Sequence, residues 1–154
     1  MKLHAVLNPG QLKAFLTSYF YVAAETRWQT IRFCIDTGSP VTIIAENDRI
    51  LMGIEYAELE RDPTGNFGIG GKVDIYESPT PLTFEFVGET GVYSHTFPRL
   101  RFMRGHTRQA RIVARVVPSI VGVDFIMDSV RLTVEGRKTV FEVKDQPVPA
   151  MLGQ

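Results

Sequence analysis

The sequence predicts a single all-β domain with a barrel-like architecture. Many short segments rich in β-branched and aromatic residues alternate with turn residues, which is typical of such domains. The length of 154 residues and the hydrophobic content of 44% suit one globular domain. No fixed-period repeat, low-complexity tract or interdomain linker divides the chain. We therefore expect one domain over residues 1–154, with its core at about 12–143 and an extended tail at 144–154.

The expected strands combine β-branched or aromatic residues with alternating apolar and polar positions. In chain order they are Leu12–Ala24, Thr30–Ile35, Phe67–Tyr76, Leu82–Val87, Val92–Leu100, Ala110–Val117, Val130–Val134 and Thr139–Val143. Glycine-containing turns at 88–91 and 135–138 predict two hairpins. Two short helices are expected, at Ala45–Met52 and Val123–Asp128.

The charges of the chain cancel overall but are unevenly distributed. Seventeen Lys and Arg balance 17 Asp and Glu, so attraction of the whole chain to nucleic acid or anionic lipid is not expected. Between Thr90 and Arg115, however, there are six arginines and no acid. This segment could be an anion or RNA patch, or simply a solvated face. Few aromatics are interspersed among its arginines, which favours the solvated face and predicts no nucleic-acid partner.

The single cysteine, Cys34, excludes an internal disulfide and any zinc site built on several cysteines. It suits a reducing compartment, and we expect a cytoplasmic protein. The apolar stretch Ala14–Ala24 alternates as a strand does and matches a signal peptide only weakly. No segment approaches the roughly 20 apolar residues that span a bilayer, so no membrane partner is expected. No metal site is expected from the histidines, which are far apart in the sequence: His4, His95 and His106.

A short polar motif follows the apolar strand that ends at Ile35. Asp36 stands directly after this strand, where the chain turns and can leave a carboxylate facing a cavity. Gly38 lets the backbone approach a ligand closely, and the hydroxyls of Thr37 and Ser39 can donate hydrogen bonds. Taken alone, the motif is better explained as an ordinary turn that ends a strand.

Three further features follow the motif in a specific order. The segment Phe67–Val73 places three glycines among β-forming residues, which suits a mobile hairpin tip. The segment Ser119–Ile126 is an apolar run that contains a glycine and leads into a short helix, and the hairpin Arg131–Val143 ends the core. With these features the sequence resembles the retropepsin-like aspartic proteases over approximately Leu12–Val143.

The resemblance implies a closed barrel with a glycine-rich flap hairpin and an aspartic endopeptidase that acts on extended polypeptides. A chain of this length cannot hold the two lobes of a pepsin, so it implies a homodimer in which each copy supplies one Asp36. Two carboxylates that are so close share one proton. The ionised one would take a proton from the attacking water, and the protonated one would hydrogen-bond the scissile carbonyl. No cofactor is implied.

The resemblance also assigns a role to each residue of the motif and the flap. Thr37 would cross-link the two active-site loops, and Ser39 would hold the outer oxygen of Asp36. The glycines would face the substrate backbone, with the isoleucine of the flap covering it. The implied site is catalytic Asp36, supporting Thr37, Gly38 and Ser39, and flap residues Ile69, Gly70 and Gly71.

The chain departs from the retroviral pattern at two positions. Retroviral members usually carry an acid and an arginine that pair near the dimer interface, and here these positions are Pro40 and Val123. Losing both partners together avoids a stranded buried charge, so the fold is still expected. Asp124 is typical of the non-viral members.

Two other functions fit the same residues. A dimeric peptide-binding or regulatory module could keep the fold, bind an extended strand through main-chain hydrogen bonds and cleave little. An RNA-associated factor could act through the arginine-rich segment. The intact Asp36–Ser39 motif favours the enzyme, because a pure binder has no need of paired carboxylates.

Overall fold

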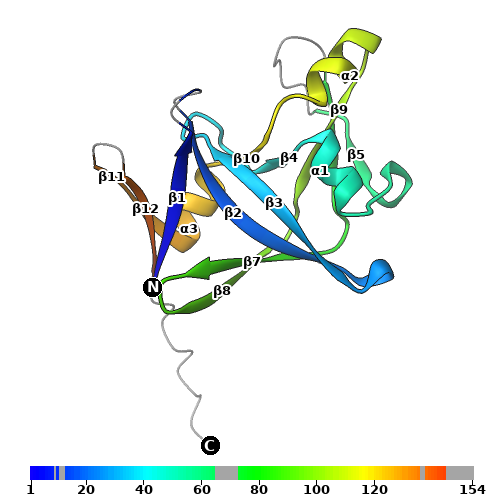
Figure 1. The fold of residues 1–154 in the computed structure, drawn as a ribbon. Helices are drawn as coiled ribbons and strands as arrows, with labels where there is room; N and C mark the ends of the chain where they lie inside the picture. The colour runs from blue at the N-terminus through cyan, green and yellow to red at the C-terminus, as the bar shows by residue number, and fades with distance from the viewer. Residues whose placement is uncertain (9, 11–12, 65–72, 136–137, 145–154) are drawn as a thin grey trace, which may run out of the picture.

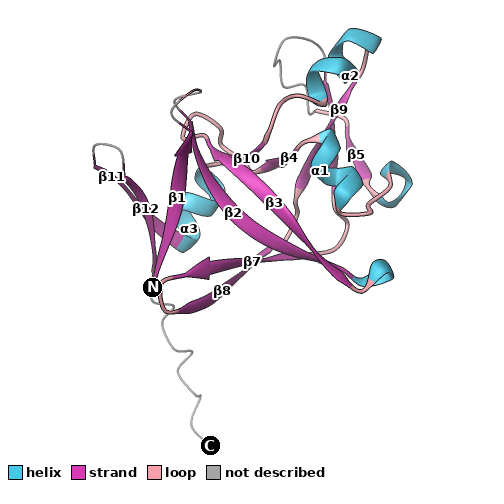
Figure 2. Cartoon of the chain, viewed as in Figure 1, coloured by secondary structure: helices cyan, strands magenta, loops and turns pink. Residues whose placement is uncertain are grey.

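Strands dominate the part of the chain that the structure describes, which is residues 1–8, 10, 13–64, 73–135 and 138–144 of a computed structural model (Figures 1 and 2). The strands are β1 (Lys2–Asn8), β2 (Lys13–Val22), β3 (Arg27–Ile35), β4 (Ile43–Ile44), β5 (Glu60–Asp62), β6 (Val73–Glu77), β7 (Leu82–Gly88), β8 (Gly91–Phe97), β9 (Arg101–Gly105), β10 (Ser119–Val121), β11 (Val130–Glu135) and β12 (Lys138–Val143). The α-helices are α1 (Glu46–Leu51), α2 (Arg108–Ala114) and α3 (Val123–Ser129). The predicted all-β class is confirmed.

The strands are hydrogen-bonded in one continuous order, β11-β12-β1-β2-β3-β10-β4-β9-β6-β5, and the β7–β8 hairpin joins it through β2. Among the described strands this order does not close into a ring. The parallel pairing of β10 with β3 joins segments that are far apart in the sequence. The strand that leads into the Asp36 motif therefore lies in the middle of the sheet, with β2 on one side and β10 on the other.

Most sequence predictions of elements are confirmed, including both helices and both hairpins. The prediction of a strand at Ala110–Val117 is wrong, because this segment contains most of α2. The Thr107 hydroxyl caps the helix by accepting a hydrogen bond from the Ala110 amide at 3.1 Å. Ala110 and Ala114, four residues apart, are both buried on one helix face. A helix therefore forms here, because packing of this small-residue face outweighs the β propensity of the neighbouring valines.

A large aromatic core joins the distant parts of the chain. Its fully buried aromatic side chains come from β3, β7, β9, α3 and β12, and are Phe33, Phe84, Phe86, Phe102, Phe125 and Phe141. The rings pack against one another; those of Phe86 and Phe125, for example, are tilted with their centroids 5.4 Å apart, a favourable arrangement for aromatic pairs. A smaller cluster, formed by Ile43, Val73, Ile75 and Met103, lies beneath α2.

The first strand is tied into the sheet on both sides. β1 pairs with β12 and with β2, and the Val143 amide donates to the Met1 carbonyl at 2.9 Å. Figure 1 shows the N-terminus beside the turn between β7 and β8, where the Glu89 amide donates to the Lys2 carbonyl at 3.0 Å. The predicted flap tip and most of the predicted tail lie outside the described residues.

Candidate active site

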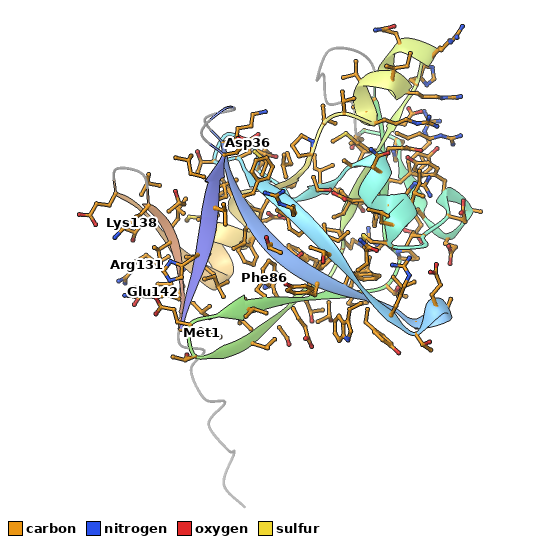
Figure 3. The ribbon with its side chains drawn as sticks, in the orientation of Figure 1. Met1, Asp36, Phe86, Arg131, Lys138 and Glu142 are labelled. Atoms are coloured by element: carbon orange, nitrogen blue, oxygen red, sulfur yellow. The ribbon has the colours of Figure 1, made fainter. Side chains whose placement is uncertain are left out.

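Asp36 lies at the end of β3, where the chain leaves the sheet. Its amide donates to the Val121 carbonyl at 3.1 Å, so β10 holds the position at which β3 ends. One carboxylate oxygen accepts a hydrogen bond from the Gly38 amide at 2.9 Å. Figure 3 shows Asp36 at one end of the sheet, away from Arg131, Lys138 and Glu142 on the β11–β12 hairpin. A half-buried carboxylate with one fixed oxygen is thus presented at the surface.

The three residues after Asp36 differ in their exposure and in their hydrogen bonds. Thr37 and Gly38 are exposed, and within the described part of the chain the Thr37 hydroxyl has no hydrogen-bond partner. The Ser39 hydroxyl donates to the Val41 carbonyl at 2.7 Å, so it does not hold the outer oxygen of Asp36 as predicted. The carboxylate is oriented instead by the Gly38 amide.

The loop after Asp36 is fastened to the start of α3 by a partly buried network that we call the loop clamp, formed by Ser39–Thr42 and Gly122–Phe125. The Asp124 carboxylate accepts from the Thr42 amide at 3.0 Å and from the Thr42 hydroxyl at 2.7 Å. It also accepts from the Phe125 amide at 2.8 Å. The Thr42 hydroxyl in turn accepts from the Gly122 amide at 3.1 Å. These bonds fix the course of the loop that carries Asp36.

The loop clamp contains the two positions at which the chain departs from the retroviral pattern, Pro40 and Val123. The Val123 amide donates to the Ser39 carbonyl at 2.9 Å, and the Asp124 amide donates to the Pro40 carbonyl at 3.3 Å. Main-chain bonds therefore join the two segments that lack a charged side-chain pair. Asp124 supplies the only carboxylate of the clamp, and its partners are neutral.

Gly122 is required by the close approach of these two segments. A Cβ atom at this position would lie 2.5 Å from the carbonyl carbon and oxygen of Val41 and 2.8 Å from the Ser39 carbonyl oxygen. The backbone atoms that it would meet belong to the loop clamp itself. The apolar-run-and-glycine pattern in the sequence thus marks a contact that only glycine permits.

Sequence reasoning missed Thr42, which is 1% exposed and central to the clamp. Its partner Asp124 is 82 positions further along the chain. In the sequence, Thr42 is marked only by its position six residues after Asp36, and nothing near it identifies Asp124 as its partner.

An apolar pocket lies beside the loop clamp and beneath α2. Ile43, which follows Thr42 directly, forms part of its wall, and the start of β6 forms another part. The full lining is Ile43, Val73, Ile75, Met103, Ala110, Val113, Ala114 and Val117. The cavity has a volume of about 10 Å³, room for about one water molecule, so it is a small gap in the packed core beneath α2.

Other candidate residues are placed apart from Asp36 or serve the structure. The Cys34 thiol is buried, and burial raises its pKa, which disfavours a role as a nucleophile. His4 is 2.5 Å from Glu89, and His106 is 3.1 Å from Asp74. Among the described residues no group of three or more His, Cys, Asp or Glu is arranged to hold a metal, and no described helix is long and apolar enough to cross a membrane. The flap residues of the predicted site, Ile69, Gly70 and Gly71, lie outside the described residues.

The fold is similar to that of a solved retropepsin-like aspartic protease from Rickettsia conorii, with a TM-score of 0.59. The match covers 92% of this chain and 89% of the other at 12% sequence identity. No protein-family model and no curated protein matches this chain by sequence. At this identity the likeness shows the fold alone, and it confirms the predicted retropepsin-like fold. What the chain does must therefore be argued from the residues around Asp36.

Proposed function

We propose that the protein is an aspartic endopeptidase that acts as a homodimer and hydrolyses peptide bonds in extended polypeptides without a cofactor. The observation that carries this proposal is the Asp36 carboxylate at the end of β3, oriented by the Gly38 amide. The loop clamp fixes the same loop, and a fold of this type is found in an aspartic protease. A carboxylate that is fixed yet accessible is what proton transfer to and from a reacting water requires.

A second copy of the chain completes the site. One chain has a single Asp-Thr-Gly motif, whereas the reaction needs one ionised and one protonated carboxylate. Placing two copies of Asp36 together gives this pair, because two adjacent carboxylates cannot both ionise at low cost. The exposed Thr37 hydroxyl, free of partners within the described part of one chain, suits a bond to the loop of the second copy.

The reaction proceeds by addition of water to the scissile carbonyl. The ionised Asp36 takes a proton from the water as the water oxygen bonds to the carbonyl carbon. The protonated Asp36 of the second copy donates to the carbonyl oxygen as negative charge develops there. The tetrahedral intermediate collapses when the first Asp36 passes the proton that it took from the water to the amide nitrogen and the carbon–nitrogen bond breaks. The second Asp36 then recovers a proton from a hydroxyl of the intermediate, which restores the starting pair.

Cleavage of a peptide library at acidic and neutral pH tests the catalytic assignment. We expect the wild type to cut peptides and Asp36→Asn to lose roughly a thousandfold or more in kcat/KM. Glu142→Gln, on the distant β11–β12 hairpin, removes a carboxylate of the same charge and should keep full activity (Figure 3). Cleavage that survives Asp36→Asn would remove Asp36 from the chemistry. Binding of peptides with no cleavage by any form would favour the peptide-binding module instead.

A further inference from the structure

We infer that a cationic cleft beside β3 binds an acidic side chain of the polypeptide substrate, a few residues from the scissile bond. This inference rests on the proposed function and adds a substrate class to it. The cleft is formed by the start of β2, the middle of β3, the start of α1 and the segment after α2. The polar residues that define it are Lys13, Arg32, Asn47, Asp48 and Arg115.

The cleft carries an excess of positive charge. Three cationic side chains line it against one carboxylate, and within the described part of the chain none of the three forms an ion pair. The carboxylate, Asp48, accepts a hydrogen bond from the Ser119 hydroxyl at 2.5 Å and so is engaged at the base of α1. Two other arginines of the basic segment are already paired, since Arg99 and Arg101 lie 3.0 and 3.1 Å from Glu77.

Arg32 is held in a position that suits recognition of a carboxylate. Its guanidinium lies over the Phe15 ring, 5.1 Å from the ring centroid, a cation–π contact that restrains the side chain. No hydrogen bond to another described residue occupies its donors. A planar guanidinium restrained in this way can offer two parallel N–H groups to a carboxylate.

The cleft lies beside the strand that leads to Asp36. Arg32 and Cys34 share one face of β3, and Asp36 directly follows the strand in the same alternation, while Ile31 and Phe33 are buried in the core. Four residues of extended chain separate Arg32 from Asp36, which corresponds to about 13 Å. A substrate in extended conformation covers the same length in about four residues. An acidic residue roughly that far from the scissile bond would therefore reach Arg32.

Lys13 places a second cation close to Asp36. Phe15 and Cys34 are the last pair of the β2–β3 register, and Lys13 lies two residues beyond Phe15, toward the end of β3 that precedes Asp36. Both charges are near the Cys34 thiol, because Lys13 lowers its pKa and Asp36 raises it. The positive charge thus extends from the active-site end of β3 to Arg115, which lies beyond α2.

The lining of the cleft favours an acidic peptide over RNA. Bases bind to proteins by stacking on exposed aromatic rings, but Phe15 is only 8% exposed and is covered by Arg32. The cleft has no other aromatic residue. The chain has no net positive charge that would attract a nucleic-acid backbone over its whole surface.

A binding experiment tests the cleft independently of catalysis. Full-length Asp36→Asn is titrated into a fluorescent oligoglutamate peptide, a matched oligoglutamine peptide and a single-stranded RNA, with anisotropy as the readout. We expect oligoglutamate to bind at least about fivefold more tightly than oligoglutamine, and less tightly as salt is raised. Adding Arg32→Gln or Arg115→Gln should remove this preference, whereas Arg131→Gln on β11 should keep it. Equal binding of the two peptides, or Arg32-dependent binding of RNA alone, would overturn the inference.

A cleavage experiment separates failure of the cleft from failure of the proposed function. A peptide that the wild type cuts is made with Glu or Gln about four residues from the scissile bond, on each side in turn. We expect Glu on one side to raise kcat/KM about fivefold in the wild type, mainly through KM, and to have no effect in Arg32→Gln. Cleavage without a preference for Glu would overturn the inference that the cleft binds acidic side chains, while the proposed protease function would stand. Binding that depends on Arg32 without any cleavage would support the cleft and refute the proposed function.

Discussion

The loop clamp and the α2 segment (Gly105–Arg115) both adjoin the apolar pocket but are held by different forces. The clamp is made of hydrogen bonds to backbone groups and to the carboxylate of Asp124, across segments with almost no room between them. The α2 segment is held by a helix cap, by two buried alanines and by an ion pair that is exposed on one side. Buried hydrogen bonds cannot be lost without leaving unsatisfied groups, whereas a surface helix can shift. We therefore expect the clamp to be the rigid part and α2 the adaptable part.

Two glycine-to-alanine substitutions should give the largest difference in stability between the loop clamp and the α2 segment. In Gly122→Ala the new Cβ meets Val41 backbone at 2.5 Å, and in Gly105→Ala it meets Arg111 backbone at 2.3 Å. Because the clamp cannot move without losing hydrogen bonds, we expect Gly122→Ala to lower the free energy of unfolding by about 3 kcal/mol or more. Because α2 can move outward, we expect Gly105→Ala to cost about half as much. Urea unfolding monitored by fluorescence measures both.

The matched control for the glycine pair is Gly10→Ala. Its Cβ would make only an ordinary contact of 3.6 Å with the Asn8 side chain, so stability should change by less than about 0.5 kcal/mol. Equal losses for Gly122→Ala and Gly105→Ala would show that the two regions are equally rigid and would break the comparison.

Removal of single polar side chains should give the next largest difference in stability between the loop clamp and the α2 segment. Asp124→Ala leaves the buried amide and hydroxyl of Thr42 without their acceptor, so we expect a loss of about 2–3 kcal/mol. Thr107→Ala removes the cap of α2 and should cost about 1 kcal/mol. Asp124→Asn, which keeps one acceptor oxygen, should fall between them in thermal and urea unfolding. A larger loss for Thr107→Ala than for Asp124→Ala would reverse the proposed order.

The smallest effect concerns the ion pair at the base of α2. The hydrogen bond from His106, together with the Arg61 guanidinium, holds the pKa of Asp74 below its ordinary value. A carboxyl with a lowered folded-state pKa contributes stability above its unfolded value, about 3.9, and loses it as the pH falls through the folded one. The stability difference between the wild type and Asp74→Asn should therefore narrow between pH 6 and pH 3. A constant difference over this range would exclude a contribution from Asp74 ionisation.

Features set by residues adjacent in the chain could be predicted from the sequence, whereas features set by long-range contacts could not. The Asp36 motif and the helix after Gly122 were predictable because each depends on residues that are adjacent in the chain. Thr42 was not, because its function depends on Asp124, which the fold brings next to it. The segment Ala110–Val117 was predicted wrongly because its β-branched residues favour a strand, while the deciding contacts of Ala110 and Ala114 come from β4, β6 and β9.

Short strands were also missed where long-range pairing creates them. β1 was not predicted, and it obtains one of its two neighbours from β12 at the other end of the described chain. β4 and β10 have only two and three residues, and both depend on pairing with segments distant in the sequence. The cationic cleft has the same origin, since Lys13, Arg32 and Arg115 come from three separate segments.

The central claim is that one chain is half of an active site, and subunit mixing tests it most directly. A fixed amount of wild type is combined with increasing amounts of Asp36→Asn, the subunits are allowed to exchange, and peptide cleavage is measured. Mixed dimers hold one carboxylate, so the account predicts that activity falls toward zero as the variant is added in excess. The same excess of Asp36→Asn carrying a disrupted dimer contact, Thr37→Val, should inhibit less. Activity that stays constant at every ratio would mean that each chain carries a complete site and would contradict the account.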